Sequence, residues 1–442
     1  MAYLIHFLSI SLVTLALAFP TDVEGSSSTD PIEYCKDCTN GAIKFHFLSE
    51  VLENSQRVDV YLPKDYDLGA DNIRYPVIYT LDGWTLSELV GGVVKHLSQT
   101  ASMPEAIVVS IDQHYAKGIT PQLYSNQSGW SDDPKDKAFW SDKNGADDYL
   151  NFLKNELIPL IDKHYRTNSF KALIGMSPTA SFAMHSLITE PELFNAHFLF
   201  AATDVIGMGY TPEKTLIDSL VETLSKKPEH MGILYVASSM READKQPAQQ
   251  KNVETITNAL KPFKNFKVKA EHIENYGHYP MAVTGLLSAL DLVFPRAKFD
   301  SSSILNHMRE NPQNGTVTEQ LMQHYKTLSD YVGFEVKPYS NLTRNANSLR
   351  SVTRMLRKEG RFDEAIELGQ LWVKQQPKSA YAYYKLSESY LAAGLYKAAK
   401  KQNSKGLDIA KVNKDPNIAH YINQKVNIEK QLRTQAQAVN SD

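Results

Sequence analysis

The chain has 442 residues, a length that predicts two or three domains rather than one. Its composition, 42% apolar and 22% charged, is that of a globular protein with enough aromatic residues for a sizeable core. The net charge of −3 at pH 7 gives no electrostatic case for a nucleic-acid partner, which would require an excess of Lys and Arg.

Residues 1–18 have the pattern of a secretory signal peptide. The stretch from Phe7 to Ala18 is nearly all apolar or small, and Ala16-Leu17-Ala18 is a small-x-small cleavage signature. This stretch is too short to span a bilayer comfortably, and no later stretch has the length and apolarity of a membrane helix. The sequence therefore predicts a secreted or periplasmic protein cut after Ala18, with an uncleaved anchor or a buried strand as the alternative.

Residues 19–40 are a polar, flexible lead-in that carries both cysteines of the chain, Cys35 and Cys38. In an oxidising compartment this spacing favours a small local disulfide. A redox site would need a surrounding βαβ pattern, which is missing, and a metal site would need two more ligands nearby. We therefore predict a structural disulfide and no metal.

Residues 41–298 alternate between strand and helix patterns. Strands are predicted at 57–62, 75–81, 106–111, 170–174, 196–202, 232–237 and 266–273, and helices at 148–165, 181–189, 252–261 and 280–294. About 35 polar, aromatic-spotted residues ending at Asp147 predict a long loop of the kind that borders binding sites. The alternation predicts an α/β domain with a mostly parallel sheet and helices on both faces.

The strand patterns stop after Pro295, and the rest of the chain is helical. We predict a helical linker at 299–345 and helical repeats at 346–437, because Gly360 and Gly394 stand 34 positions apart, as do Ala365 and Ala399. This is the tetratricopeptide period. Two clear copies are too few for a free-standing array, so we expect the repeats to dock on the α/β domain or on a protein partner.

Ser177 is the candidate nucleophile. It lies in Gly175-Met176-Ser177-Pro178-Thr179, between a predicted strand and a predicted helix, which is the context of a nucleophile elbow. Two neighbours depart from the usual pattern: Thr179 replaces the second glycine, and Pro178 lacks the N–H that donates to an oxyanion. The alternative is an ordinary helix start with Ser177 near its cap.

The other candidate groups follow from strand order. His278 lies between the last strand and the last helix, where a general base belongs. The segment after the penultimate strand offers Glu242 as the acid, with Asp244 as the alternative. A second oxyanion donor is expected from the N–H of Trp84. Two aromatic side chains are candidates for substrate binding, and both could equally belong to the core: Tyr124 and Trp130.

These segments resemble the Putative esterase family of α/β hydrolases, which includes enterochelin-esterase-like and esterase D-like enzymes. The likeness covers about Phe45 to Phe294 and rests on four segments: 75–83, 103–109, 118–121 and 190–196. One branch of the family carries tetratricopeptide-like repeats after the catalytic domain, and residues 331–334 fit that branch.

The resemblance implies an α/β-hydrolase fold followed by an all-α repeat domain, and a serine hydrolase of small-molecule carboxylic esters without metal or organic cofactor. It implies Ser177 as nucleophile, His278 as base and an acid within 238–244. The alternative function is a catalytically degenerate binding or scaffold protein, since Pro178 removes one oxyanion donor.

Overall fold

The computed structural model describes residues 32–34, 41–112, 118–124, 145–244, 247–299, 308, 311–340 and 348–439. Residues 1–18, Cys35, Cys38 and Trp130 lie outside these residues, so the predictions made for them stay predictions. In the part of the chain that the structure describes, no helix has both the length and the apolarity needed to cross a bilayer.

A single nine-stranded sheet forms the centre of the α/β domain. Its strand order is β1-β2-β3-β5-β4-β6-β7-β8-β9. The strands are β1 Ile32–Tyr34, β2 Ile43–Ser49, β3 Asn54–Tyr61, β4 Tyr75–Thr80, β5 Ile107–Asp112, β6 Thr167–Met176, β7 Ala196–Phe200, β8 Gly232–Ser239 and β9 Phe266–Ile273. Strands β1, β2, β3 and β5 pair antiparallel, whereas all neighbours from β5 through β9 pair parallel. The predicted mostly parallel sheet is confirmed.

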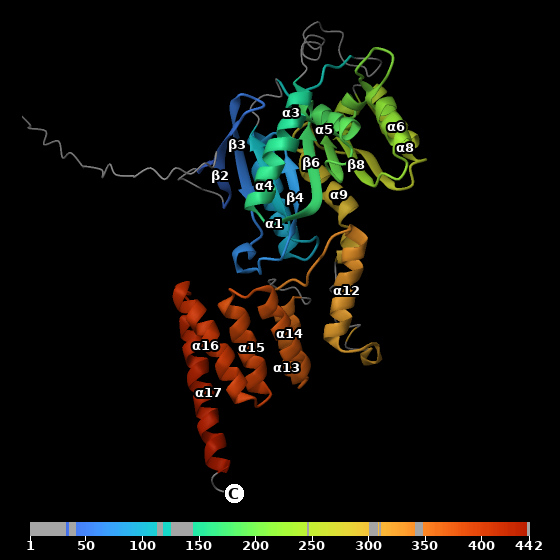
Figure 1. Cartoon of the computed structure of the whole chain (residues 1–442). Helices are drawn as coiled ribbons and strands as arrows, with labels where there is room; N and C mark the ends of the chain where they lie inside the picture. Colours follow the sequence, from blue (N-terminus) through green and yellow to red (C-terminus); the bar gives the residue numbers. More distant parts are fainter. Residues whose placement is uncertain are drawn as a thin grey trace, which may run out of the picture.

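Helices cover both faces of this sheet (Figure 1). They are α1 Gly83–Gln99, α3 Ala146–Phe152, α4 Ile158–His164, α5 Pro178–Thr189, α6 Leu216–Lys226, α7 Met240–Ala243, α8 Pro247–Leu260, α9 Met281–Val293 and α10 Arg296–Phe299. Buried side chains of α1 and α9 share one core cluster with one face of the sheet. Those of α3, α4, α5, α6 and α8 share a second cluster with the other face.

The structure corrects several predicted elements. The single helix expected at 148–165 is interrupted by a π-helical turn, Leu153–Leu157, between α3 and α4. Helix α5 begins at Pro178 rather than at 181, because proline suits the first turn of a helix. The pattern does not predict α1, whose Gly91-Gly92 pair is poor helix sequence. A Cβ at Gly91 would lie 2.7 Å from the Tyr61 ring, so tertiary packing requires this glycine.

The C-terminal part is helical and follows a repeated geometry. Its helices are α12 Val317–Val332, α13 Leu349–Lys358, α14 Phe362–Gln375, α15 Ala380–Ala392, α16 Tyr396–Val412 and α17 Ile418–Val439. Gly360 follows α13 with φ 76°, and Gly394 follows α15 with φ 74°, so the 34-residue spacing marks two equivalent left-handed turns. Membership of the tetratricopeptide class stays a prediction.

This helical domain docks on the end of the sheet where the parallel strands begin. The N–H of Ala70, before β4, donates to the carbonyl of Gln375 at 2.8 Å, and the Tyr339 hydroxyl donates to the carbonyl of Met103, before β5. The Phe334 ring lies 5.4 Å from that of Phe170 in β6. The core cluster under α1 and α9 continues through α12, α13 and α14.

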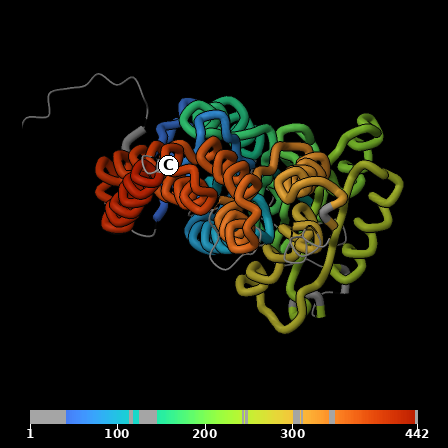
Figure 2. Tube along the Cα trace, turned by 90° about the horizontal axis from the view of Figure 1, so that it is seen from below, coloured from blue at the N-terminus to red at the C-terminus, as the bar shows by residue number. Residues whose placement is uncertain are grey.

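Figure 2, seen from below, shows the orange and red helices spread beneath the blue and cyan segments of the α/β domain. The expected docking of the repeats on the α/β domain is therefore observed. It leaves the opposite end of the sheet, where the parallel strands finish, free of the helical domain (Figure 1).

Candidate active site

Ser177 occupies a sharp turn between β6 and α5. Its backbone has φ 55° and ψ −118°, a conformation that non-glycine residues rarely adopt and that costs about 1–3 kcal/mol. The Ser177 side chain makes no capping hydrogen bond to α5, so it does not act as an ordinary helix cap. The Ser177 N–H donates to the carbonyl of Phe200 at 2.8 Å, which ties the turn to the end of β7. This strained strand–turn–helix geometry is that of a nucleophile elbow.

Gly175 allows β6 and α5 to approach at this turn. A Cβ at Gly175 would lie 2.4 Å from the carbonyl oxygen of Thr179 and 2.9 Å from the nitrogen of Ala180. Thr179, which replaces the usual second glycine, is completely buried. Its side chain is accommodated because it points to a hydrogen-bonding partner on another segment.

That partner is Asp82, a residue that the sequence analysis treats only as part of a turn. The Thr179 hydroxyl hydrogen-bonds to Asp82 Oδ2, and the Met176 N–H donates to Thr179 Oγ1 at 2.7 Å. Burial raises the pKa of Asp82 to about 7, while the Thr179 hydroxyl and the Met176 N–H lower it in part. No sequence pattern signals this contact, because the two residues lie on different βα turns.

Helix α1 supplies the candidate oxyanion donors. It starts directly after β4 and Asp82, so the N–H groups of Gly83 and Trp84 lie in its first turn, where amides have no helical partner. The positive end of the helix dipole favours negative charge at the same place. Pro178 at the first position of α5 has no N–H to add to this set.

His278 lies in the segment that joins β9 to α9. The ring centroid of His278 is 5.0 Å from that of Tyr279, which is 6.2 Å from that of Trp84. The hydroxyl of Ser239, at the end of β8, donates to the carbonyl of Tyr276 at 2.5 Å and anchors this segment. The structure thus brings Trp84 and the predicted histidine to the two ends of one aromatic cluster.

The predicted acid segment differs in form from the expected loop. Strand β8 extends through Ser239, and α7 follows at once, with Glu242 inside it. The side chain of Glu242 is outside the described part of the chain. Asp244 follows α7, is exposed, and raises the pKa of His272, although burial lowers that pKa by more. The choice between Glu242 and Asp244 therefore stays a prediction.

Tyr124 lies at the other side of the predicted substrate loop. Its backbone forms a two-hydrogen-bond bridge with Gly209 at 2.8 and 3.1 Å, and its side chain is 39% exposed. This exposure argues against a core role for Tyr124. Trp130 belongs to a segment outside the described residues.

A buried histidine on α5 holds two segments next to this bridge. His185 Nδ1 lies 2.8 Å from the hydroxyl of Tyr210, and its Nε2 lies 2.9 Å from Asp147 Oδ1. Burial lowers the pKa of His185, and the bond to Asp147 opposes this shift. The sequence analysis misses this chain because its three members come from distant segments.

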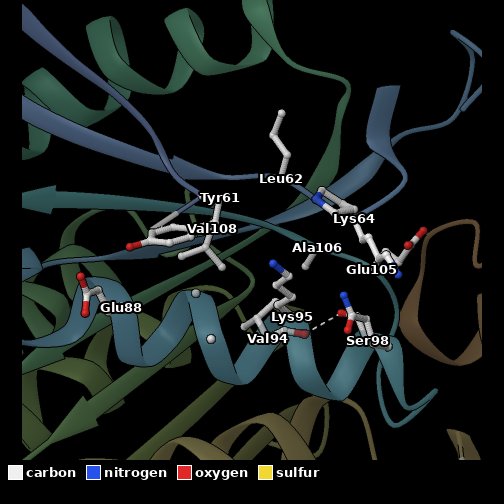
Figure 3. A pocket seen from close by; sticks show the side chains of 15 residues that line it. Tyr61, Leu62, Lys64, Glu88, Val94, Lys95, Ser98, Glu105, Ala106 and Val108 are labelled. Atoms are coloured by element: carbon white, nitrogen blue, oxygen red, sulfur yellow. Dashed lines mark hydrogen bonds between the residues drawn. The ribbon is translucent and has the colours of Figure 1, made fainter. Parts of the chain in front are cut away.

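A cavity of about 220 Å³ lies elsewhere, between α1, the end of β3 and the start of β5 (Figure 3). Lys64 and Lys95 point towards it, and both side chains are exposed. Among the described residues that line it are none of Ser177, Trp84 and His278. The cavity is therefore separate from the candidate active site.

Comparisons with known proteins agree with the fold and the elbow. The family described as Putative esterase matches residues 49–279. The chain is 24% identical to the Ferri-bacillibactin esterase BesA of Bacillus subtilis (strain 168) over 231 residues, which are 50% of this chain and 78% of BesA. It is 26% identical over 257 residues to an Endo-1,4-beta-xylanase/feruloyl esterase of Xylanibacter ruminicola, which are 55% of this chain and 30% of that protein. It thus spans less than a third of the latter's length.

Two solved structures show the same fold. An IroE-like serine hydrolase from Shewanella oneidensis aligns with a TM-score of 0.54 and 20% identity, covering 75% of this chain and 98% of its own. An uncharacterised protein from Capnocytophaga ochracea aligns with a TM-score of 0.51 and 18% identity, covering 83% and 93%. Because the family match extends over more than half of the chain and includes the elbow, this protein belongs to the Putative esterase family, whose members are carboxylic ester hydrolases.

Proposed function

We propose that this protein is a serine hydrolase that cleaves carboxylic esters through an acyl-enzyme on Ser177. The observation that supports the proposal most is the strained φ of 55° at Ser177, between β6 and α5 and inside the segment that matches the esterase family. Strained backbone of this kind persists where the surrounding structure maintains it for a function.

In the proposed reaction the Ser177 oxygen bonds to the ester carbonyl carbon while the imidazole of His278 accepts the hydroxyl proton. The tetrahedral intermediate then collapses, and the leaving alkoxide takes that proton and departs as an alcohol. A water molecule attacks the acyl-enzyme in the same way, which releases the carboxylic acid and restores Ser177. Glu242, with Asp244 as the alternative, would hold the imidazole in the required tautomer.

The negative charge on the carbonyl oxygen would be stabilised by the first amides of α1, with Trp84 as the main donor. Since Pro178 removes the usual second donor, we expect turnover about 100- to 1,000-fold below that of an otherwise equal enzyme. Pro178→Gly should recover part of this loss, measured as an increase in kcat on short aryl esters.

The substrate class proposed is an ester with an aromatic group close to the scissile bond. Trp84 is 52% exposed and Tyr279 is 56% exposed, and their edge-to-face contact forms an aromatic surface beside His278. Two relatives are named for bacillibactin and feruloyl esters. Tyr124 and Trp130 would contact the substrate from the opposite side.

We also propose that the protein is exported and carries a Cys35–Cys38 disulfide, supported by the apolar segment before Ala18 and by the absence of further cysteines from the sequence. Sequencing the N-terminus of the mature protein should show cleavage after Ala18. An intact N-terminus on the recovered protein would contradict export by this signal.

A fluorophosphonate probe tests the central proposal. It should label Ser177, and Ser177→Ala should abolish both labelling and the hydrolysis of short aryl esters. Ser181→Ala is a matched control on the same helix, since the Ser181 hydroxyl only donates to the carbonyl of Pro178. Labelling that survives in Ser177→Ala would assign the reaction to another residue.

The second candidate function is a non-catalytic binding protein, favoured by Pro178, in which the helical domain recruits a protein partner. It predicts a folded protein that the probe does not label, and no gain of hydrolysis in Pro178→Gly.

A further inference from the structure

Thr179 and Asp82 join two turns that the proposed reaction uses. Thr179 Oγ1 accepts the N–H of Met176, lies 3.1 Å from the carbonyl of Met176 and bonds to Asp82 Oδ2. Met176 stands just before Ser177, and Thr179 stands two positions after it. One hydroxyl therefore connects both sides of the candidate nucleophile.

Asp82 is itself held firmly. It has φ 54° at the end of β4, and the next residue, Gly83, is pressed so closely on β5 that a Cβ would lie 2.8 Å from the carbonyl oxygen of Ile111. Asp82 directly precedes Gly83 and Trp84, whose amides are the candidate oxyanion donors. A bond from Asp82 to Thr179 thus sets the distance between the nucleophile turn and the oxyanion turn.

We propose that Asp82 and Thr179 are positioning residues, whose hydrogen bond holds the Ser177 turn in its strained conformation and in register with the first turn of α1. This inference rests on the proposed function. A purely local role for Thr179 would need only the bonds to Met176, whereas the bond to Asp82 crosses between two βα turns. Burial of both groups strengthens the case, because a buried hydroxyl and carboxyl that lose each other are left unsatisfied.

The test compares Thr179→Val, which keeps the shape and removes the hydroxyl, with Thr179→Ser, which keeps the hydroxyl. We expect Thr179→Val to lower kcat by about 10- to 100-fold with KM changed less than about threefold, and Thr179→Ser to stay within about threefold of the unmodified protein. Thr353→Val is the matched control, because Thr353 is buried and its hydroxyl bonds only within α13. It should leave kcat unchanged.

A double-mutant cycle with Asp82→Asn tests the pairing. If the two residues act through one bond, the double variant should lose less activity than the product of the two single losses. Multiplicative losses, unchanged kcat in a folded Thr179→Val, or equal losses in Thr179→Val and Thr179→Ser would each overturn the proposal.

Amide hydrogen exchange gives a readout that does not need activity. The peptide containing Met176 should exchange at least about tenfold faster in Thr179→Val than in Thr179→Ser, because the Met176 N–H loses its acceptor. Equal exchange would overturn the inference even if the unmodified protein proves unreactive to the probe. Missing probe labelling together with the expected exchange difference would instead reject the proposed reaction and keep the structural clasp. If Thr179→Val does not fold, the same exchange is measured in Asp82→Asn, and unchanged exchange there would overturn the inference.

Discussion

At the scale of single residues, the candidate site depends on backbone conformations that most side chains avoid. Asp82, Ser177 and Ala201 have φ values of 54°, 55° and 49°, and each lies just beyond the end of one of the parallel strands β4, β6 and β7. Each such conformation costs about 1–3 kcal/mol and is maintained only by its surroundings. The hydrogen bond from Ser177 to Phe200 and the packing of Gly175 on Thr179 supply those surroundings.

Gly175→Ala should destabilise the protein by about 2–3 kcal/mol, because the new Cβ would overlap the backbone of Thr179. Equilibrium unfolding in denaturant measures this loss. The control is Gly92→Ala in α1, where nothing lies within 4 Å of the new Cβ, and which should stabilise the protein by about 0.5–1 kcal/mol. Equal effects of the two substitutions would contradict the close packing at the elbow.

Asp82→Asn should change how stability depends on pH. Burial raises the pKa of Asp82 from 3.8 to about 7, so the folded protein keeps a proton that the unfolded chain releases. The ionised carboxyl therefore costs free energy of unfolding progressively as pH rises from about 4 to about 7, and the cost is complete above 7. Asparagine has no such cost.

The free energy of unfolding of Asp82→Asn, relative to the unmodified protein, should thus rise by roughly 2–4 kcal/mol between pH 4 and pH 7.5. Asp67→Asn, at an exposed position, is the control and should differ from the unmodified protein by less than about 0.5 kcal/mol throughout. A flat difference for Asp82→Asn would show that its carboxyl is not desolvated.

At the scale of elements, irregular turns inside helices direct specific side chains. The π-helical turn Leu153–Leu157 carries Glu156 between α3 and α4. Glu156 accepts hydrogen bonds from the Ser49 hydroxyl at 2.6 Å and from the N–H groups of Glu50 and Val51 at 3.0 and 3.1 Å. These bonds fasten the β2–β3 turn to the helical layer.

Glu156→Ala should lower the free energy of unfolding by about 2 kcal/mol, since it leaves one hydroxyl and two amides without their acceptor. Glu156→Gln should lose less, because one amide oxygen still accepts. Chemical denaturation measures both variants, with Glu254→Ala on the exposed side of α8 as a control expected within about 0.5 kcal/mol. If Glu156→Ala behaved like the control, the turn would not depend on the carboxylate.

At the scale of the whole molecule, the helical domain covers the end of the sheet opposite Ser177. The aromatic side chain of Phe334 lies between the rings of Phe170 in β6 and Phe294 after α9, at 5.4 and 6.4 Å. Since the two parts share one continuous core, we expect them to unfold together. The arrangement leaves the carboxyl ends of the parallel strands accessible to substrate.

Phe334→Ala should lower the free energy of unfolding by about 3–4 kcal/mol and shift a single thermal transition of the full chain. The control is Val412→Ala, whose side chain is 81% exposed and whose loss should cost less than about 0.5 kcal/mol. Two separate transitions in calorimetry, with only the second moved by Phe334→Ala, would contradict the shared core.

Local pattern was a sufficient guide to much of the fold. The runs at 75–81 and 266–273 predict β4 and β9 closely, because a buried strand must be apolar over its whole length. Helix α1 escaped prediction because Gly91 is chosen by the ring of Tyr61 rather than by helix propensity. Similarly, the strand–serine–helix order around Ser177 was readable from the sequence.

The sequence by itself thus determined the succession of strands and helices, the family, and the position of Ser177 and His278 after particular strands. Only the tertiary structure decided that Asp82 bonds to Thr179, that Glu156 fastens the β2–β3 turn, and that the helical domain docks away from the elbow. The physical reason is the range of the interactions. Strand and helix patterns come from neighbours a few positions apart, whereas these contacts join residues about 100 or more positions apart, which no local periodicity records.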